Sequence, residues 1–255
     1  MLADLFSLLL GCIPIYMAKA PGSFRLTVLA GVVLAGLCWY LSSVYTRMWN
    51  KKFRITATHH FLCGFASVCT LLFTILFASL YYTRDAALIS IGAWQLQLNN
   101  DAIWAERTFS KAYEKVKDLG TEDFSNAPPP GSPNSFIPTN SDESRQTAAA
   151  MYSNEACKHF DQKRPFLSKV VWSSPGVPSE VVFEDVKHWH ETNPNYPPSR
   201  AIEIAANQIK QGLQPQAPRV IYLSRLAVAA LFLLIQAIPF GLIGWAAYRD
   251  IRAQL

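Results

Sequence analysis

Four residues in the middle of the chain have side chains that bind metal ions, namely Cys157, His159, His188 and His190. They form one Cys-x-His pair and one His-x-His pair. On an extended strand, side chains two positions apart point to the same face, so each pair would present two ligands together. Thiolate and imidazole donors favour copper or zinc, and these four residues are therefore the predicted metal-binding residues. Because both spacings are shorter than those of structural zinc sites, the alternative is that they are unrelated surface or packing residues.

Side chains suited to catalysis form no known motif in this sequence. It contains no Gly-x-Ser-x-Gly turn, no His-Glu-x-x-His sequence and no glycine-rich phosphate loop. Glu184 and Asp185 lie close before His188, but adjacent charged residues are common on soluble surfaces. We therefore expect a protein that is not an enzyme and that needs no cofactor.

Aromatic residues form the second candidate site. Apolar side chains recur in residues 83–119 at spacings of mostly three, four or five, which predicts one long helix with an apolar stripe. Trp94, Trp104, Phe109 and Tyr113 belong to this stripe. Large aromatic side chains are enriched at protein interfaces, so these four are the predicted partner-binding residues. The alternative is that they pack in the core of their own domain.

The elements that must position these residues are anchored by long uncharged segments at both ends of the chain. Residues 26–45, 61–82 and 226–248 comprise 20, 22 and 23 residues without a charged side chain. A helix rises about 1.5 Å per residue, so about 20 apolar residues cross a hydrocarbon layer roughly 30 Å thick. Since a helix also satisfies its own backbone hydrogen bonds in lipid, we predict three transmembrane helices here.

A fourth apolar run, residues 2–18, is shorter and carries Asp4 near its start. No Lys or Arg precedes it, which disfavours a secretory signal sequence. We predict a short first span, with an interfacial helix or a signal sequence as alternatives. The predicted fold is thus a mainly α membrane protein with four transmembrane helices, or with three. It has a membrane region at residues 1–82, a mainly helical domain at 83–219, and a last span with a short tail at 220–255.

Basic residues in the short connections predict the orientation in the membrane. Residues 46–60 contain four basic residues and no acidic one, and the tail contains Arg249 and Arg252 against Asp250. Short cytoplasmic loops are enriched in Lys and Arg. We therefore expect this loop and the C-terminal tail in the cytoplasm, and the domain at 83–219 outside it.

Charge and cysteine usage narrow the compartment and the partners. The chain has a net charge of +5, but residues 83–219 contain 14 basic and 16 acidic residues, a net of −2. A domain without surplus positive charge is not expected to bind nucleic acid. Of five cysteines only Cys157 lies in this domain, which also lacks an Asn-x-Ser/Thr glycosylation site. These features favour a bacterial inner membrane with a periplasmic domain.

Within the domain at 83–219, most segments are expected to be helical. Residues 126–144 are rich in proline and predict a flexible segment. Residues 142–161 and 199–213 predict helices, the second separated from the last span by two prolines. The β-branched runs at 166–172 and 181–186 predict a small β-hairpin.

The order of short loops, large outer domain and last span is similar to the plan of the tetraspanins. Their Cys-Cys-Gly motif is missing, so no residue role is carried over. We expect a non-enzymatic subunit or accessory of an envelope complex of the secretion, transfer or transport type. Its expected partners are other membrane or envelope proteins and the lipid bilayer. The alternatives are an immunity protein against a membrane-acting toxin, a channel or transporter subunit, and a periplasmic metal-binding membrane protein. The spans carry no ionisable residue at mid-depth, which argues against transport.

Overall fold

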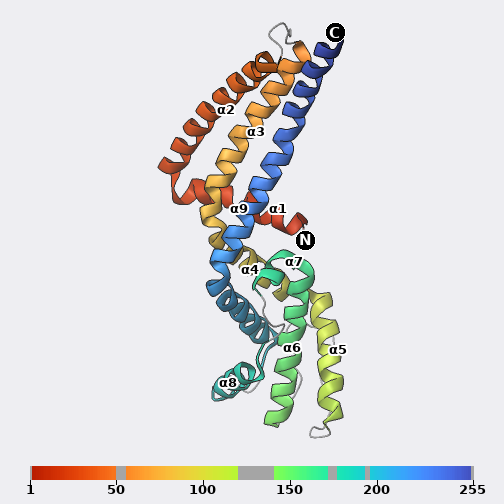
Figure 1. Ribbon diagram of the computed structural model, residues 1–255. Coiled ribbons are helices and arrows are strands. Elements are labelled where there is room, and N and C mark those ends of the chain that lie inside the picture. The colour runs from red at the N-terminus through yellow and green to blue at the C-terminus, as the bar shows by residue number, and fades with distance from the viewer. Residues whose placement is uncertain (1, 50–55, 120–140, 172–176, 193–195, 254–255) are drawn as a thin grey trace. The chain divides into compact units, whose positions relative to one another are not determined.

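The computed structural model describes residues 2–49, 56–119, 141–171, 177–192 and 196–253. Every regular element in these ranges is helical (Figure 1). The elements are α1 (Leu2–Lys19), α2 (Pro21–Trp49), α3 (Ala57–Ser79), the 3-10 helix η1 (Leu80–Tyr82), α4 (Thr83–Asn99), α5 (Ala102–Asp118), α6 (Asp142–Lys163), α7 (Pro165–Val171), α8 (Ser179–His190) and α9 (Pro198–Ala253).

The chain divides into two compact units, which we name by their composition. The apolar unit comprises Phe6–Ala86 and Arg219–Leu255, and the polar unit comprises Met1–Leu5 and Ala87–Pro218. Three helical stretches are long and apolar enough to cross a membrane: Pro21–Tyr45, Ala57–Asn99 and Pro198–Asp250. They contain the three uncharged runs found in the sequence, which confirms the prediction of a mainly α protein with candidate membrane helices at these three runs.

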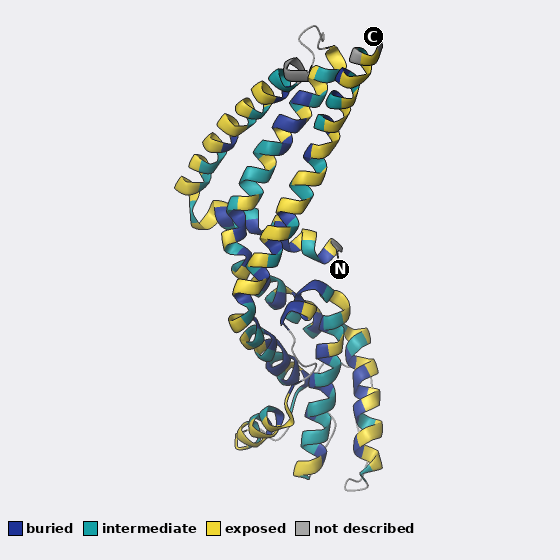
Figure 2. Cartoon of the chain, viewed as in Figure 1, coloured by how far each residue is buried: buried dark blue, intermediate teal, exposed yellow. Residues whose placement is uncertain are grey.

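Side chains on these apolar helices face outward to an unusual degree. Leu29 and Val33 of α2 and Leu234 of α9 are each more than 60% exposed. In Figure 2 much of α2 has the colour of exposed residues. Helices surrounded by lipid need no polar outer face, because hydrocarbon solvates leucine and valine well.

The helix α1 differs from the other apolar helices in its direction. Figure 1 draws it at a steep angle to α2 and α3, with which most of it shares the apolar unit. Cys12 and Tyr16 are buried one turn apart; Tyr16 contacts the Thr27 hydroxyl at 2.7 Å and stacks on Tyr82. At the end of α1, Lys19 pairs with Asp85 at 2.8 Å.

The prediction of a single long helix at residues 83–119 is wrong, because the structure has two helices there. The first, α4, ends at Asn99, and α5 begins after Asp101. The Asp101 side chain accepts a hydrogen bond from the backbone N–H of Trp104 at 3.0 Å, as an N-cap does. Asn and Asp favour caps over helix interiors, so the pair Asn100 and Asp101 interrupts a stripe whose apolar spacing continues.

The prediction of a small β-hairpin is also wrong, because the described residues contain no strand. Residues 166–171 of the first run lie in α7, and the second run, 181–186, lies in α8. The helix α7 starts at Pro165, a favoured first helical residue, and α8 buries Val182 and Val186, four positions apart. Burial at helical spacing outweighed the β preference of the branched side chains.

The remaining helix predictions were right in part. The helix expected at 142–161 is α6, with Ser141 as its N-cap. The helix expected at 199–213 does not end before Pro215 and Pro218; it continues into the last span as α9, 56 residues long. A proline removes one backbone hydrogen bond and bends a helix, but it does not have to end it. The proline-rich segment predicted at 126–144 lies outside the described residues up to residue 140.

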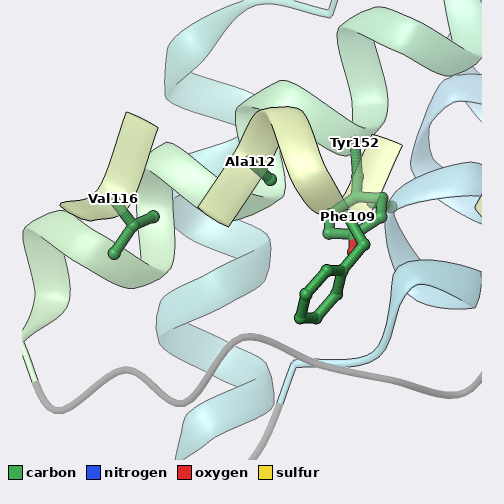
Figure 3. Close-up of a cluster of buried hydrophobic side chains, with 5 residues drawn as sticks. Phe109, Ala112, Val116 and Tyr152 are labelled. Atoms are coloured by element: carbon green, nitrogen blue, oxygen red, sulfur yellow. The ribbon is translucent and has the colours of Figure 1, made fainter. Parts of the chain in front are cut away.

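The core of the polar unit joins α5, α6 and the start of α9. Figure 3 shows Phe109, Ala112 and Val116 of α5 beside Tyr152 of α6, and Ala201 of α9 completes the buried cluster. These residues recur at three- and four-residue spacing on α5, so one face of this helix is apolar and packed. This buried cluster holds α5, α6 and the start of α9 together.

Candidate functional site

The predicted metal ligands do not come together. Cys157 and His159 both lie in α6, where two positions correspond to about 200° around the axis rather than to one face. Cys157 is buried, and burial together with the nearby Asp161 carboxylate raises the pKa of its thiol to about 12. A thiol with such a pKa stays protonated at neutral pH and is a poor metal ligand.

The three histidines are likewise in separate surroundings. The His159 Nδ1 accepts a hydrogen bond from the Trp94 indole N–H at 3.0 Å. His188 is exposed on α8 with its Nδ1 3.4 Å from a Glu191 carboxylate oxygen, whereas the ring of His190 packs against Tyr196. Among the described residues, no three His, Cys, Asp or Glu side chains gather as a metal ion requires. The prediction depended on strand geometry, and both segments are helices.

The aromatic residues predicted to bind a partner belong mainly to the core. Trp94 is 1% exposed and Phe109 is 2% exposed, so neither ring offers a surface to another protein. Trp104 and Tyr113 are partly buried and pack against the cluster of Figure 3. The alternative weighed from the sequence, packing within the domain, is correct for Trp94 and Phe109.

A polar cleft between α8 and the first turns of α9 is the strongest candidate site of the polar unit. It has a volume of about 620 Å³. Both helices contribute charged or amide side chains along its length. It is lined by Glu180, Val181, Glu184, Asp185 and His188 of α8, and by Arg200, Ile204, Asn207, Gln208 and Gln211 of α9.

One end of the cleft is braced by the Asp185 carboxylate, which holds the two helices together. The Arg200 guanidinium donates to Asp185 Oδ1 from Nη2 at 2.6 Å and from Nε at 3.1 Å. The Tyr196 hydroxyl donates to Asp185 Oδ2 at 2.6 Å, and Arg200 also lies over the Trp189 ring, 5.4 Å from its centroid. We call these four residues the brace. Its geometry is rigid because a guanidinium is planar and binds a carboxylate through two donors.

The electrostatics of the brace follow from this geometry. Hydrogen bonding to the Asp185 carboxylate raises the pKa of Arg200 above its usual value. Burial, and then the same carboxylate, raises the pKa of Tyr196. Both groups therefore keep their protons over the whole physiological range.

The other carboxylates of the cleft are available to a ligand. Glu180 and Glu184 are exposed and lie one turn apart on α8, so their side chains share a face. Among the described residues, no hydrogen bond or ion pair satisfies either carboxylate, whereas Arg200 is already engaged with Asp185 and Glu203. The sequence showed Glu184 and Asp185 beside His188. Nothing in it indicated that Arg200 would neutralise Asp185 and leave Glu180 and Glu184 without a partner among the described residues.

Comparison with protein-family models, with curated proteins and with solved structures gave no match to this chain.

Proposed function

We propose that this chain is a non-enzymatic integral membrane protein whose polar unit lies outside the cytoplasm and binds another envelope protein. It acts as a subunit or accessory of a membrane complex of the secretion, transfer or transport type. The three long apolar helices support membrane insertion. The basic residues between α2 and α3 support an orientation with that connection inside and residues 83–219 outside.

The cleft between α8 and α9 is the observation that carries the binding role. The brace holds α8 against the start of α9, so the two helices that carry the carboxylates of Glu180 and Glu184 and the amides of Asn207 and Gln211 are already in place for a partner. Preorganised polar groups reduce the entropy lost on association. Six of the ten residues that line the cleft carry a carboxylate or an amide, which suits a polypeptide with basic and backbone N–H donors.

Purification in a mild detergent tests this role. We expect the wild-type chain to retain a stoichiometric protein partner, and the double variant Glu180→Gln, Glu184→Gln to lose most of it. The matched control is Glu106→Gln, Glu114→Gln, which removes two exposed carboxylates from α5 and should leave the partner bound. The absence of any partner from the wild type, or equal retention by both variants, would contradict the proposal.

We further propose that α1 lies along the membrane surface and that the protein has three spans. At the start of α1, the Asp4 carboxylate accepts hydrogen bonds from the Phe166 backbone N–H at 3.0 Å and from Arg164 at 3.3 Å. At its end, Lys19 pairs with Asp85, just after the span that contains α3. Both contacts involve residues of the 83–219 segment, and a helix whose two ends meet the same side of a membrane does not cross it. This argument favours the interfacial alternative over the short first span.

An epitope tag fused before Met1 tests the placement of α1. Under this proposal, protease added to intact spheroplasts removes that tag, while a tag fused after Leu255 is removed only when the membrane is permeabilised. Protection of both tags would instead support four spans.

A further inference from the structure

The last turns of α9, which lead to the terminus marked C in Figure 1, carry two arginines that stack on aromatic rings of the same helix. The guanidinium carbon of Arg249 lies 5.5 Å from the centroid of the Trp245 ring. That of Arg252 lies 5.3 Å from the centroid of the Tyr248 ring. All four side chains are exposed. We call these four residues the arginine face, and all of them belong to the apolar unit.

The spacing of these residues places them on one side of the helix. Residues three, four and seven apart lie on the same face of an α-helix, and positions 245, 248, 249 and 252 are related by these intervals. The acidic residue nearby, Asp250, lies about 100° around the axis from Arg249, away from the arginine face. Among the described residues, no carboxylate forms an ion pair with Arg249 or Arg252, so their positive charges are not neutralised there.

The arginine face lies where α9 would leave a membrane. The uncharged run 226–248 has 23 residues, about 34 Å of helix, which is enough to cross a hydrocarbon layer roughly 30 Å thick. Arg249 is the first charged residue after this run, so a span through it brings the arginine face to the level of the lipid headgroups. Tryptophan and tyrosine are enriched at the same level. Their presence beside both arginines agrees with this placement.

An exposed apolar stripe continues from the arginine face toward the middle of the span. Leu234, Ile238 and Leu242 follow one another at intervals of four residues, and Trp245 comes three residues later, so all four share one side of the helix. Their exposed fractions are 68%, 58%, 50% and 61%. This side of α9 thus presents hydrocarbon side chains first and then the paired rings and guanidinium groups. A phospholipid has the same order of chemistry, with its acyl chains before its phosphate.

Stacking on a ring leaves the donors of each guanidinium available to an anion. The ring contacts the flat face of the guanidinium, whereas its N–H groups lie in the plane and point outward from its edges. A phosphate accepts two such parallel donors at once. Because the stacked ring also restricts a long flexible side chain, less conformational entropy is lost when an anion binds. The arginine face therefore offers two oriented phosphate-binding groups at one membrane boundary.

We infer that the arginine face binds the phosphate of an anionic phospholipid, whose acyl chains lie along the stripe of Leu234, Ile238 and Leu242. Two positive charges match a headgroup with a net negative charge, whereas a zwitterionic headgroup brings its own cation, which competes with the arginines for the phosphate. The inference rests on the proposed insertion of the apolar unit in a membrane. It does not rest on the cleft between α8 and α9, which belongs to the polar unit. In the proposed orientation the lipid lies in the cytoplasmic leaflet.

Native mass spectrometry of the full-length chain in a mild detergent tests this inference. Phosphatidylglycerol and phosphatidylcholine with identical acyl chains are added in turn, and the fraction of protein that carries each lipid is measured. We expect the wild type to prefer phosphatidylglycerol, and Arg249→Gln together with Arg252→Gln to reduce this preference about tenfold or more, because charge-assisted hydrogen bonds are lost. The matched control is Arg219→Gln together with Arg225→Gln, which should keep the preference. It removes two exposed arginines of the same helix that stack on no aromatic ring among the described residues.

Equal binding of the two lipids by the wild type, or an equal loss of preference in both double variants, would overturn the inference. Arg249→Lys together with Arg252→Lys keeps both charges but removes the planar pairs of donors, so it should bind phosphatidylglycerol less tightly than the wild type does. Unchanged binding in this variant would mean that point charges suffice, and would refute the stacked site. A wild-type chain that stays dispersed without detergent or lipid would instead contradict membrane insertion itself.

Discussion

Replacing Asp185 by Asn removes the charge at the centre of the brace while keeping the size of the side chain. The carboxylate receives three hydrogen bonds from Arg200 and one from Tyr196. Its side chain is 14% exposed and that of Arg200 is 31% exposed, so the pair is partly shielded from water. An Asn amide offers one acceptor oxygen, and its NH₂ group would face a donor.

The expected loss follows from the number and exposure of these bonds. A hydrogen bond to a charged group contributes about 1.5–3 kcal/mol, and removing one member of a buried ion pair costs about 3–5 kcal/mol. Arg200 is partly solvated and keeps its contact with Glu203 at 2.9 Å, which offsets part of the loss. We therefore expect α8 to be destabilised by about 2 kcal/mol, which corresponds to local opening about 30-fold more often.

Hydrogen exchange of the α8 amides, followed by mass spectrometry on the full-length chain, measures this opening. Asp185→Asn should increase the exchange rate of α8 about 30-fold while the core helix α5 stays close to wild type. Glu203→Gln is the control, because that side chain is 46% exposed and its ion pair should contribute less than about 1 kcal/mol. Exchange of α8 in Asp185→Asn within threefold of wild type would refute the assignment of the brace as the contact that holds the cleft.

Three further predictions concern other contacts of the structure. Burial lowers the pKa of His159, and so does the charge of Lys163, while Asp101 has the opposite effect. As the pH falls, His159 is therefore protonated in the unfolded chain before it is protonated in the folded chain. The stability that His159 contributes is therefore complete at pH values above its unfolded pKa of about 6.5 and is lost as the pH decreases below that value. Between pH 7.5 and pH 5, the melting temperature should decrease less in His159→Gln than in wild type. Asp101→Ala should cost about 1 kcal/mol and speed amide exchange in the first turn of α5, and unchanged exchange there would exclude a capping role. Gln236→Leu should lower the stability of the chain in detergent by about 0.6–1.7 kcal/mol, measured by thermal unfolding, since its amide joins α9 to α3.

The membrane helices and the helix α6 were predictable because their causes are local. An uncharged run of about 20 residues has one stable form in hydrocarbon, whatever the rest of the chain does. Ser141 followed by acidic residues likewise determines a helix start within a single turn. In both cases the energy that decides the structure comes from residues close together in sequence.

The errors arose where local preferences opposed each other or were outweighed by packing. Val182 and Val186 favour a strand by residue type, but their burial on one face of α8 favours a helix. Pro215 and Pro218 suggested an end to the helix, yet α9 continues past them to the last span. The spacing of Cys157 and His159 would place both side chains on one face only in a strand, and both residues lie in the helix α6, as the capping pattern at 142–161 predicted.

What the sequence by itself determined is the division into apolar and polar segments, since hydrophobicity and charge are properties of each residue. Only the tertiary structure decided which charges are neutralised and where cavities lie. Asp185 and Arg200 are fifteen positions apart, and Asp4 meets residues more than 150 positions away. Whether Glu180 and Glu184 keep free carboxylates depends on such long-range contacts. Their energies depend on the distances that folding creates and that no local pattern contains.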